Sequence, residues 1–143
     1  AATGNLKRVS LELGGKSPLI LFDDTDPDVA LDFALFGIYA GQGEVCNAGS
    51  RILVQRSMFE SFIERFAAAC EKIVVGPGLE ETSEMGPLIT RSHQSKVLAM
   101  IASGVEEGAR LLVGGGEPYS DRRSAGNFVR PTAFVNVPST ARV

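Results

Sequence analysis

Ser17-Pro-Leu-Ile-Leu-Phe-Asp-Asp-Thr-Asp-Pro27 is the stretch that decides the fold of this chain. Its apolar half, residues 17–22, is short and continuous, which is typical of a buried β-strand. Its acidic half ends in Asp26, a good N-cap residue, and Pro27, which suits the first position of a helix. A strand that leads directly into a helix is therefore expected. Apolar residues from Val29 to Ile38 predict that this helix is buried on most of its sides.

The alternation of strands and helices continues along the chain. Further strands are predicted at residues 51–55, 111–113 and 132–137, and helices at about 57–73 and 92–107, where apolar residues recur at helical spacing. Ser57 and Glu60 have the spacing of a capping box. Residues 8–13 alternate weakly and indicate one more strand. Together these elements predict an α/β domain with a mostly parallel sheet and flanking helices.

The composition bounds the class of protein. The chain has 143 residues, of which 44% are hydrophobic and 22% charged, and this is ordinary for one globular domain. A net charge of −3 argues against nucleic-acid and anionic-membrane partners, and no apolar run reaches the ~18 residues of a membrane span. Two cysteines make no disulfide framework, so a cytoplasmic location is expected. Because the chain starts without Met and stops without a polar tail, we expect residues 1–143 to be one part of a longer polypeptide.

Cys46 is the first candidate for chemistry. It lies in a small, polar segment, residues 41–50, that is predicted to be a loop, with Gly43 and Gly49 on either side. The thiolate is the reactive form of cysteine, and an open, polar setting favours it. The alternative is a buried loop cysteine that acts as a small hydrophobic residue. Cys70, by contrast, lies on the apolar stripe of a predicted helix and is interpreted as structural.

Glu12 is the candidate general base. It lies between Leu11 and Leu13, directly before Gly14 and Gly15. Partial burial in this apolar neighbourhood would raise the pKa of the carboxyl group toward the range of a useful base. The alternative is a solvated side chain on an edge strand. The two glycines allow the backbone to approach a ligand or to turn tightly. A thiol with a separate base indicates covalent catalysis.

Three other motifs lead to no site. The acidic residues 23–26 could form a metal cluster, but a helix cap in a solvated loop is favoured, so no metal site is predicted. The glycines at 114–116 are interpreted as a turn, since no Lys-Ser/Thr pair follows them. Residues 41–46 resemble the start of a dinucleotide fingerprint, but Cys46 replaces its third glycine and the segment follows a helix.

Two segments resemble the signatures of the aldehyde dehydrogenase superfamily. Residues 11–18 resemble its glutamate signature and residues 43–51 its cysteine signature, and the 34-residue separation of Glu12 and Cys46 is the family's own. Short stretches at residues 85–89, 107–109, 114–116 and 131–132 follow in the family's order. The resemblance covers about residues 4–143 and implies the Rossmann-like catalytic domain of that fold.

The resemblance also implies a reaction. Cys46 would attack an aldehyde carbonyl, and Glu12 would activate the water that hydrolyses the resulting thioester. The implied cofactor is NAD or NADP, the substrate is a small-molecule aldehyde, and the complete protein is a homo-oligomer, either a dimer or a tetramer. Leu13 and Gly14 would lie beside the nicotinamide. Lys96 and His93 would lie near the adenosine ribose.

Two positions depart from the family pattern. Glu44 stands where glutamine is commoner, and its carboxylate would disfavour the Cys46 thiolate if it faced inward. Gly41 stands where asparagine is frequent, which predicts a more flexible loop. The resemblance further implies that the cofactor-binding domain, the asparagine of the oxyanion hole and the oligomerisation strand lie outside residues 1–143. This segment alone is therefore expected to be inactive.

Two alternative functions remain open. The first is a CoA-acylating semialdehyde dehydrogenase, in which a thiol rather than water releases the acyl group. The second is an inert scaffold or binding protein on the same fold. Glu12 argues for hydrolysis, and the presence of both Glu12 and Cys46 argues against the scaffold.

Overall fold

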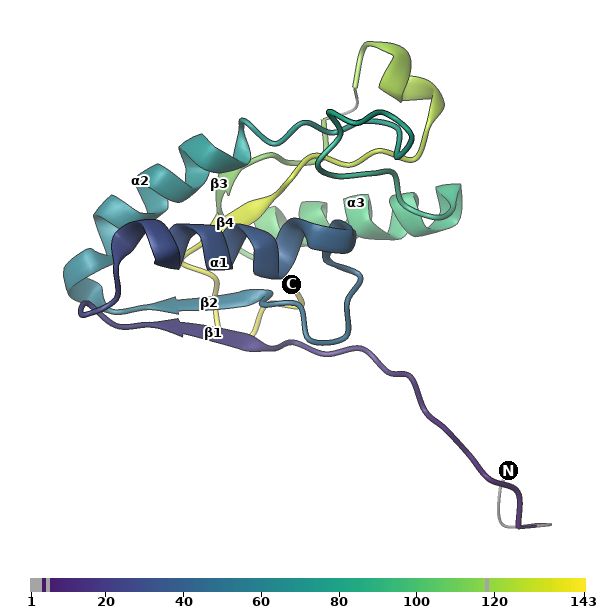
Figure 1. The fold of residues 1–143 in the computed structure, drawn as a ribbon, viewed down its shortest axis with the longest axis horizontal. Coiled ribbons are helices and arrows are strands. Elements are labelled where there is room, and N and C mark those ends of the chain that lie inside the picture. Colours follow the sequence, from purple (N-terminus) through teal and green to yellow (C-terminus); the bar gives the residue numbers. More distant parts are fainter. Residues whose placement is uncertain (1–3, 5, 118) are drawn as a thin grey trace.

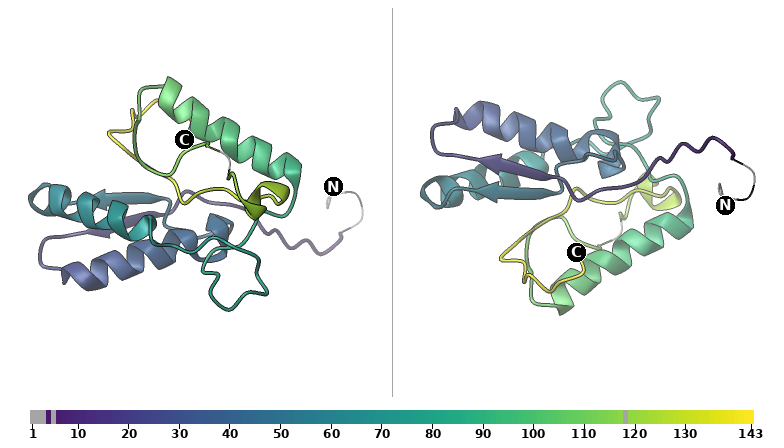
Figure 2. Two further views of the ribbon diagram at one scale, coloured as in Figure 1. Left: turned by 90° about the horizontal axis from the view of Figure 1, so that it is seen from above. Right: turned by 90° about the horizontal axis from the view of Figure 1, so that it is seen from below.

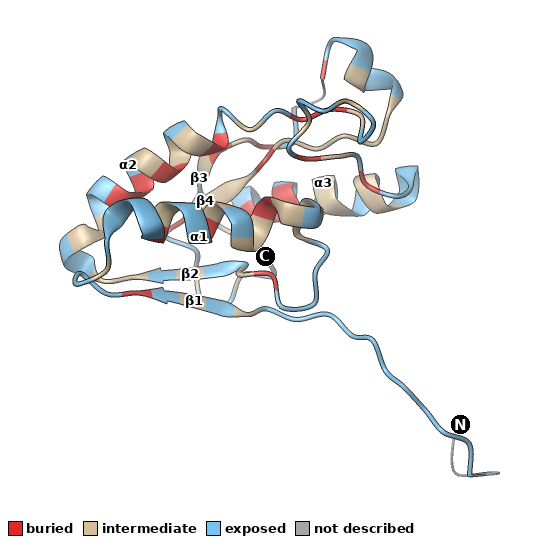
Figure 3. Ribbon diagram, in the orientation of Figure 1, coloured by how far each residue is buried: buried red, intermediate tan, exposed pale blue. Residues whose placement is uncertain are grey.

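The computed structural model describes residue 4, residues 6–117 and residues 119–143. Residues 6–17 form an extended segment that projects from the rest of the fold and is exposed along most of its length (Figures 1 and 3). The strand predicted at residues 8–13 is wrong, because this segment pairs with no described strand. A strand exists only where its backbone N–H and C=O groups find partners, and weak alternation does not supply them.

A parallel strand pair begins the folded part of the chain. β1 (Pro18–Leu21) pairs with β2 (Arg51–Val54), and α1 (Pro27–Tyr39) is the crossover between them. Parallel neighbours require such a crossover, and both strands then start at the same edge of the sheet. The segments that precede β1 and β2 therefore meet at that edge (Figure 1).

The acidic turn after β1 caps the helix, as predicted. An Asp26 carboxylate oxygen accepts hydrogen bonds from the backbone N–H groups of Asp28 and Val29 at 2.9 and 3.1 Å. Asp23 accepts instead from the Gln55 amide and the Ser57 hydroxyl, at 2.5 and 2.7 Å. The acidic turn therefore caps α1 and ties the ends of β1 and β2 together.

The burial predicted for α1 is wrong. Ala30 and Ala34 are buried, but Phe33 and Phe36 are 65% and 75% exposed. Only one side of α1 faces the packed interior (Figure 3), and its buried residues are Ala30, Ala34 and Tyr39. Apolar residues all round a helix predict burial only where other elements surround that helix, and none of the described elements covers the outer face of α1.

The second helix begins later than its sequence predicts. η3 (Arg56–Met58) precedes α2 (Phe59–Cys70), and the N-cap residue Met58 makes no capping hydrogen bond through its side chain. The capping box predicted at Ser57 is therefore wrong, because the Ser57 hydroxyl donates to Asp23. The apolar stripe itself is confirmed. Its buried members are Phe62, Ile63, Phe66 and Cys70.

The second half of the chain adds a helix and an antiparallel strand pair. α3 (Arg91–Glu106) and α2 both contact β3 (Arg110–Val113), which pairs with β4 (Ala133–Val135) (Figure 2). One hydrophobic core runs from Leu21 of β1 to Val135 of β4. The predicted α/β class with flanking helices is confirmed, and the two strand pairs are one parallel and one antiparallel. None of the described helices has both the length and the apolarity to cross a membrane.

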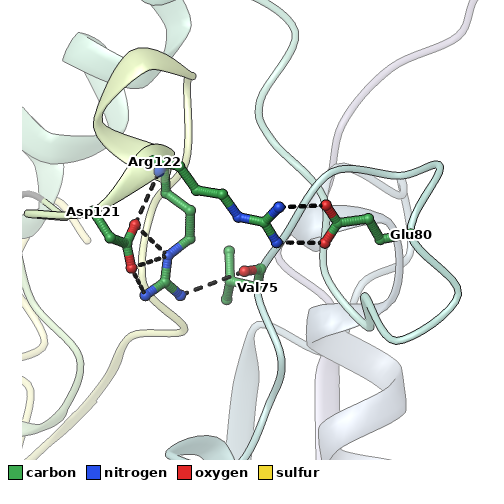
Figure 4. Close-up of polar contacts among 5 residues, drawn as sticks. Val75, Glu80, Asp121 and Arg122 are labelled. Atoms are coloured by element: carbon green, nitrogen blue, oxygen red, sulfur yellow. Dashed lines mark hydrogen bonds and ion pairs between the residues drawn. The ribbon is translucent and has the colours of Figure 1, made fainter.

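A network of arginines holds the long loop between β3 and β4. η4 (Arg122–Ala125) lies in this loop, and Arg122 makes two hydrogen bonds to Glu80, at 2.6 and 2.7 Å (Figure 4). Arg123 pairs with Asp121 at 2.5–3.0 Å and lies 3.8 Å from the centroid of the Tyr119 ring. The loop is thus fastened to the segment that follows α2.

Candidate active site

The structure brings together the two segments that the sequence marks for catalysis. Gly15 packs so closely on the Cys46 loop that a Cβ atom at position 15 would lie 2.5 Å from the Cys46 carbonyl oxygen. Two residues further on, the Ser17 carbonyl accepts a hydrogen bond from the Arg51 N–H at 3.3 Å. These contacts follow from the parallel pair, because the segments before β1 and β2 begin at one edge.

A left-handed turn carries the chain into the Cys46 loop. η2 (Ala40–Gly43) contains three consecutive residues with positive φ: Gly41 at 63°, Gln42 at 59° and Gly43 at 74°. With its amide turned to the orientation that satisfies both neighbours, the Gln42 side-chain oxygen accepts from the Gly86 N–H at 3.0 Å and its NH2 group donates to the Gly41 carbonyl at 2.9 Å. Glycine at position 41 thus serves a left-handed backbone that other residues rarely adopt.

Cys46 is exposed in this chain, in contrast to the buried alternative. Hydrogen bonds hold the loop on its far side, from Ala48 N–H to the Val45 carbonyl at 3.0 Å and from Gly49 N–H to the Gly37 carbonyl at 2.9 Å. Among the described residues, none accepts a hydrogen bond from the Cys46 N–H. The loop therefore presents both a thiol and a free backbone donor.

Of the two possibilities left open for Glu12, partial burial and a solvated side chain, the structure shows the solvated one. Glu12 is exposed, and its neighbours Leu11 and Leu13 are 71% and 68% exposed. The Glu12 carboxylate makes no hydrogen bond or ion pair with the residues that the structure describes. Gly15, rather than the Glu12 side chain, makes the described contact with Cys46. Glu12 lies on a segment that reaches the nucleophile, while its own side chain remains free.

Glu44 faces α3. Its carboxylate oxygen Oε1 lies 3.2 Å from Nε2 of His93. His93 lies in the first turn of α3, where its backbone N–H donates to the side chain of Thr90, the N-cap residue, at 3.1 Å. The sequence did not predict the pairing of Glu44 with His93, since only the fold brings the Cys46 loop and α3 together.

An open groove of about 720 Å³ adjoins the Cys46 loop. Its walls come from the left-handed turn, α3 and the segment before β4. It is largely apolar and has a few charged groups at its rim. The charged residues of its lining are Lys16, Glu44, His93, Lys96 and Arg130. Two of the four predicted cofactor contacts, His93 and Lys96, thus lie in the groove, whereas Leu13 and Gly14 are exposed outside its lining. Lys16 was missed by the sequence analysis.

Cys70 is structural, as predicted. It is 2% exposed, and its thiol donates to the Tyr39 hydroxyl at 3.5 Å. The Tyr39 hydroxyl donates in turn to the Thr132 carbonyl at 3.2 Å. Burial raises the pKa of the Cys70 thiol and also that of the Tyr39 hydroxyl. The chain therefore has one exposed and one buried cysteine, which are chemically distinct.

Comparison with known proteins decides the family. The sequence matches the aldehyde dehydrogenase family over residues 1–143. The chain belongs to that family. It is 42% identical to a betaine aldehyde dehydrogenase of Sinorhizobium fredii over 96% of its length, and 41% identical to that of Bacillus subtilis over its whole length. It spans about 28% of the length of these curated relatives.

Solved structures agree with this assignment. A betaine aldehyde dehydrogenase from Staphylococcus aureus, crystallised in complex with NAD+, superposes with a TM-score of 0.93 and 41% sequence identity. A putative aldehyde dehydrogenase from Burkholderia cenocepacia gives a TM-score of 0.91, also at 41% identity. Each match covers 99% of this chain and 28% or 29% of the solved chain. The resemblance predicted from residues 11–18 and 43–51 is confirmed, as is the fold.

Proposed function

We propose that the full-length protein oxidises a small aldehyde to a carboxylic acid through a thioester on Cys46. The observation that carries this proposal is the close packing of Gly15 on the exposed Cys46 loop, which brings the Glu12 segment to the thiol. Membership of the aldehyde dehydrogenase family supports the reaction class. Because the relatives compared above are betaine aldehyde dehydrogenases, betaine aldehyde is one substrate to test.

The residues of this chain account for two bond-forming steps. The Cys46 thiolate attacks the carbonyl carbon, so a C–S bond forms and the carbonyl oxygen becomes an alkoxide. The free Cys46 N–H is available to donate to that oxygen, as in an oxyanion hole. After oxidation leaves a thioester, Glu12 takes a proton from water, the water oxygen attacks the acyl carbon, and the C–S bond breaks to release the acid.

The cofactor proposed is NAD or NADP, and when bound it would accept the hydride. The groove offers cationic and donor side chains, Lys16, Lys96 and His93, which suit a ligand that carries phosphates and ribose hydroxyls. Leu13 and Gly14 are proposed to lie beside the nicotinamide. The Staphylococcus aureus relative that was crystallised with NAD+ supports NAD in particular.

The proposal extends to the organisation of the complete protein. We regard residues 1–143 as one part of a catalytic domain, consistent with their coverage of about 28% of the relatives' length. The remaining cofactor contacts and an oligomerisation segment would then come from other parts of the polypeptide. We propose a cytoplasmic homo-oligomer, and no activity for the 143-residue segment by itself.

The function is tested with the full-length protein by following the formation of NADH through its absorbance. An aldehyde panel that includes betaine aldehyde is assayed with and without CoA, for the wild type and for Cys46→Ala. We expect NADH without CoA, and its loss in Cys46→Ala. A signal that requires CoA would move the reaction to acyl transfer. Full activity in Cys46→Ala would overturn the role of Cys46.

A further inference from the structure

One contact joins the Cys46 loop to α3. Glu44 lies two residues before Cys46, directly after the left-handed turn, and its Oε1 atom is 3.2 Å from His93 Nε2. The two side chains are 41% and 37% exposed, so the pair lies at the surface of the groove with part of its area covered. Among the described residues, His93 is the only partner of the Glu44 carboxylate.

The other charged side chains in the lining of the groove are cationic. Lys16, from the segment before β1, Lys96 from α3 and Arg130 from the segment before β4 line the same groove as His93. Glu44 is the only carboxylate in the described lining of the groove. The contact with His93 therefore fixes where the charge of Glu44 lies.

The position of that charge matters for Cys46. Residues two apart in a chain are separated by roughly 7 Å between Cα atoms at most, so a free Glu44 carboxylate can approach the Cys46 thiol. A negative charge at that range disfavours ionisation of a thiol to the thiolate, which is the reactive form. A carboxylate that is held 3.2 Å from the His93 ring nitrogen on α3 is kept from approaching the thiol and exerts much less of this effect.

We propose that His93 is a positioning residue for Cys46: it holds the Glu44 carboxylate on α3 and so keeps the nucleophile reactive. This inference rests on the proposed function of Cys46 and gives His93 a role toward the nucleophile in addition to its place in the groove.

Alkylation of Cys46 by iodoacetamide in the full-length protein without cofactor tests the proposal. The reaction is run at neutral pH, and the label is located by peptide mass spectrometry. We expect His93→Ala to slow alkylation of Cys46 roughly fivefold, the effect of one unscreened charge at close range in water. We expect Glu44→Gln to react at least as fast as the wild type. The double variant should recover the wild-type rate, and Ser92→Ala, an exposed neighbour on α3, should match the wild type.

Recovery of the wild-type alkylation rate in the double variant distinguishes positioning of Glu44 from a general structural effect of the His93 substitution. If His93→Ala merely loosened α3, removal of the Glu44 charge would not restore the rate, and that result would overturn the proposal. An unchanged rate in His93→Ala would overturn it as well. The proposed function fails by a different result, which is aldehyde oxidation by Cys46→Ala, so the two failures are distinguishable.

Discussion

Gly15 is the residue on which the geometry of the site depends. A methyl group at this position would lie 2.5 Å from the Cys46 carbonyl oxygen, whereas a methyl group at Gly14 would meet no atom within 4 Å. Gly15→Ala should therefore push the two segments apart and cost about 2 kcal/mol of folding free energy, as overpacking against backbone does. Gly14→Ala is the matched control. Chemical unfolding of both full-length variants checks this, and equal stabilities would contradict the contact.

The two cysteines should differ sharply in reactivity. Burial raises the pKa of the Cys70 thiol, so it stays neutral at neutral pH, and its 2% exposure blocks access. Cys46 is exposed. We expect a thiol reagent to label Cys46 at least tenfold faster than Cys70 in the folded protein, and both at similar rates in denaturant. Equal, slow labelling in the folded state would favour the inert scaffold.

The exposure of the two candidate catalytic residues could be predicted only in part from the sequence. The glycine-flanked, polar setting of Cys46 indicated a loop but left open whether the thiol is exposed or buried, and the structure has it exposed. The apolar neighbours of Glu12 left partial burial open, but the segment is exposed because no described element covers it. The pairing of Glu44 with His93 left no local signal, because it depends on the packing of α3 beside the Cys46 loop.

For the helices and strands, the sequence predicted correctly those features that contacts between neighbouring residues determine. Asp26 and Pro27 predicted the start of α1 correctly, since a cap is satisfied within one turn. Ser57 failed as a cap because Asp23, distant in sequence, competes for its hydroxyl. The strand predicted at residues 8–13 failed for the same kind of reason, because pairing depends on a neighbour that the segment itself does not reveal.

Protonation of Asp121 in acid should destabilise the loop that carries η4. Hydrogen bonds from Arg123 lower the pKa of Asp121 from 3.8 to about 2. The carboxylate therefore stabilises the folded state above pH 3.8, and this contribution disappears as the pH falls through about 2. Asp121→Asn should be less stable than the wild type at neutral pH and should converge with it below pH 2. Asp24→Asn, an exposed control, should show no such convergence in unfolding curves measured across this range.

The folded chain exposes more apolar side-chain surface than a single packed domain usually exposes. Phe33 and Phe36 of α1 and Ile20 and Leu53 of the parallel pair are each at least 46% exposed. Composition and periodicity predicted these residues as interior, and in this chain they lie outside. A chain that spans about 28% of its relatives' length has much less of the fold to bury them, and the proposed catalytic domain would supply the cover.

The most direct test of the account is the mass of the Cys46 peptide during turnover. Glu12→Gln in the full-length protein is mixed with NAD and an aldehyde that the wild type oxidises, then quenched in acid, and Cys46 is examined for an acyl group. Without the base, the thioester is not hydrolysed efficiently. We therefore predict a burst of NADH whose molar amount equals that of the enzyme, and an acyl adduct on Cys46. Undiminished steady turnover, or an adduct elsewhere than Cys46, would contradict the account.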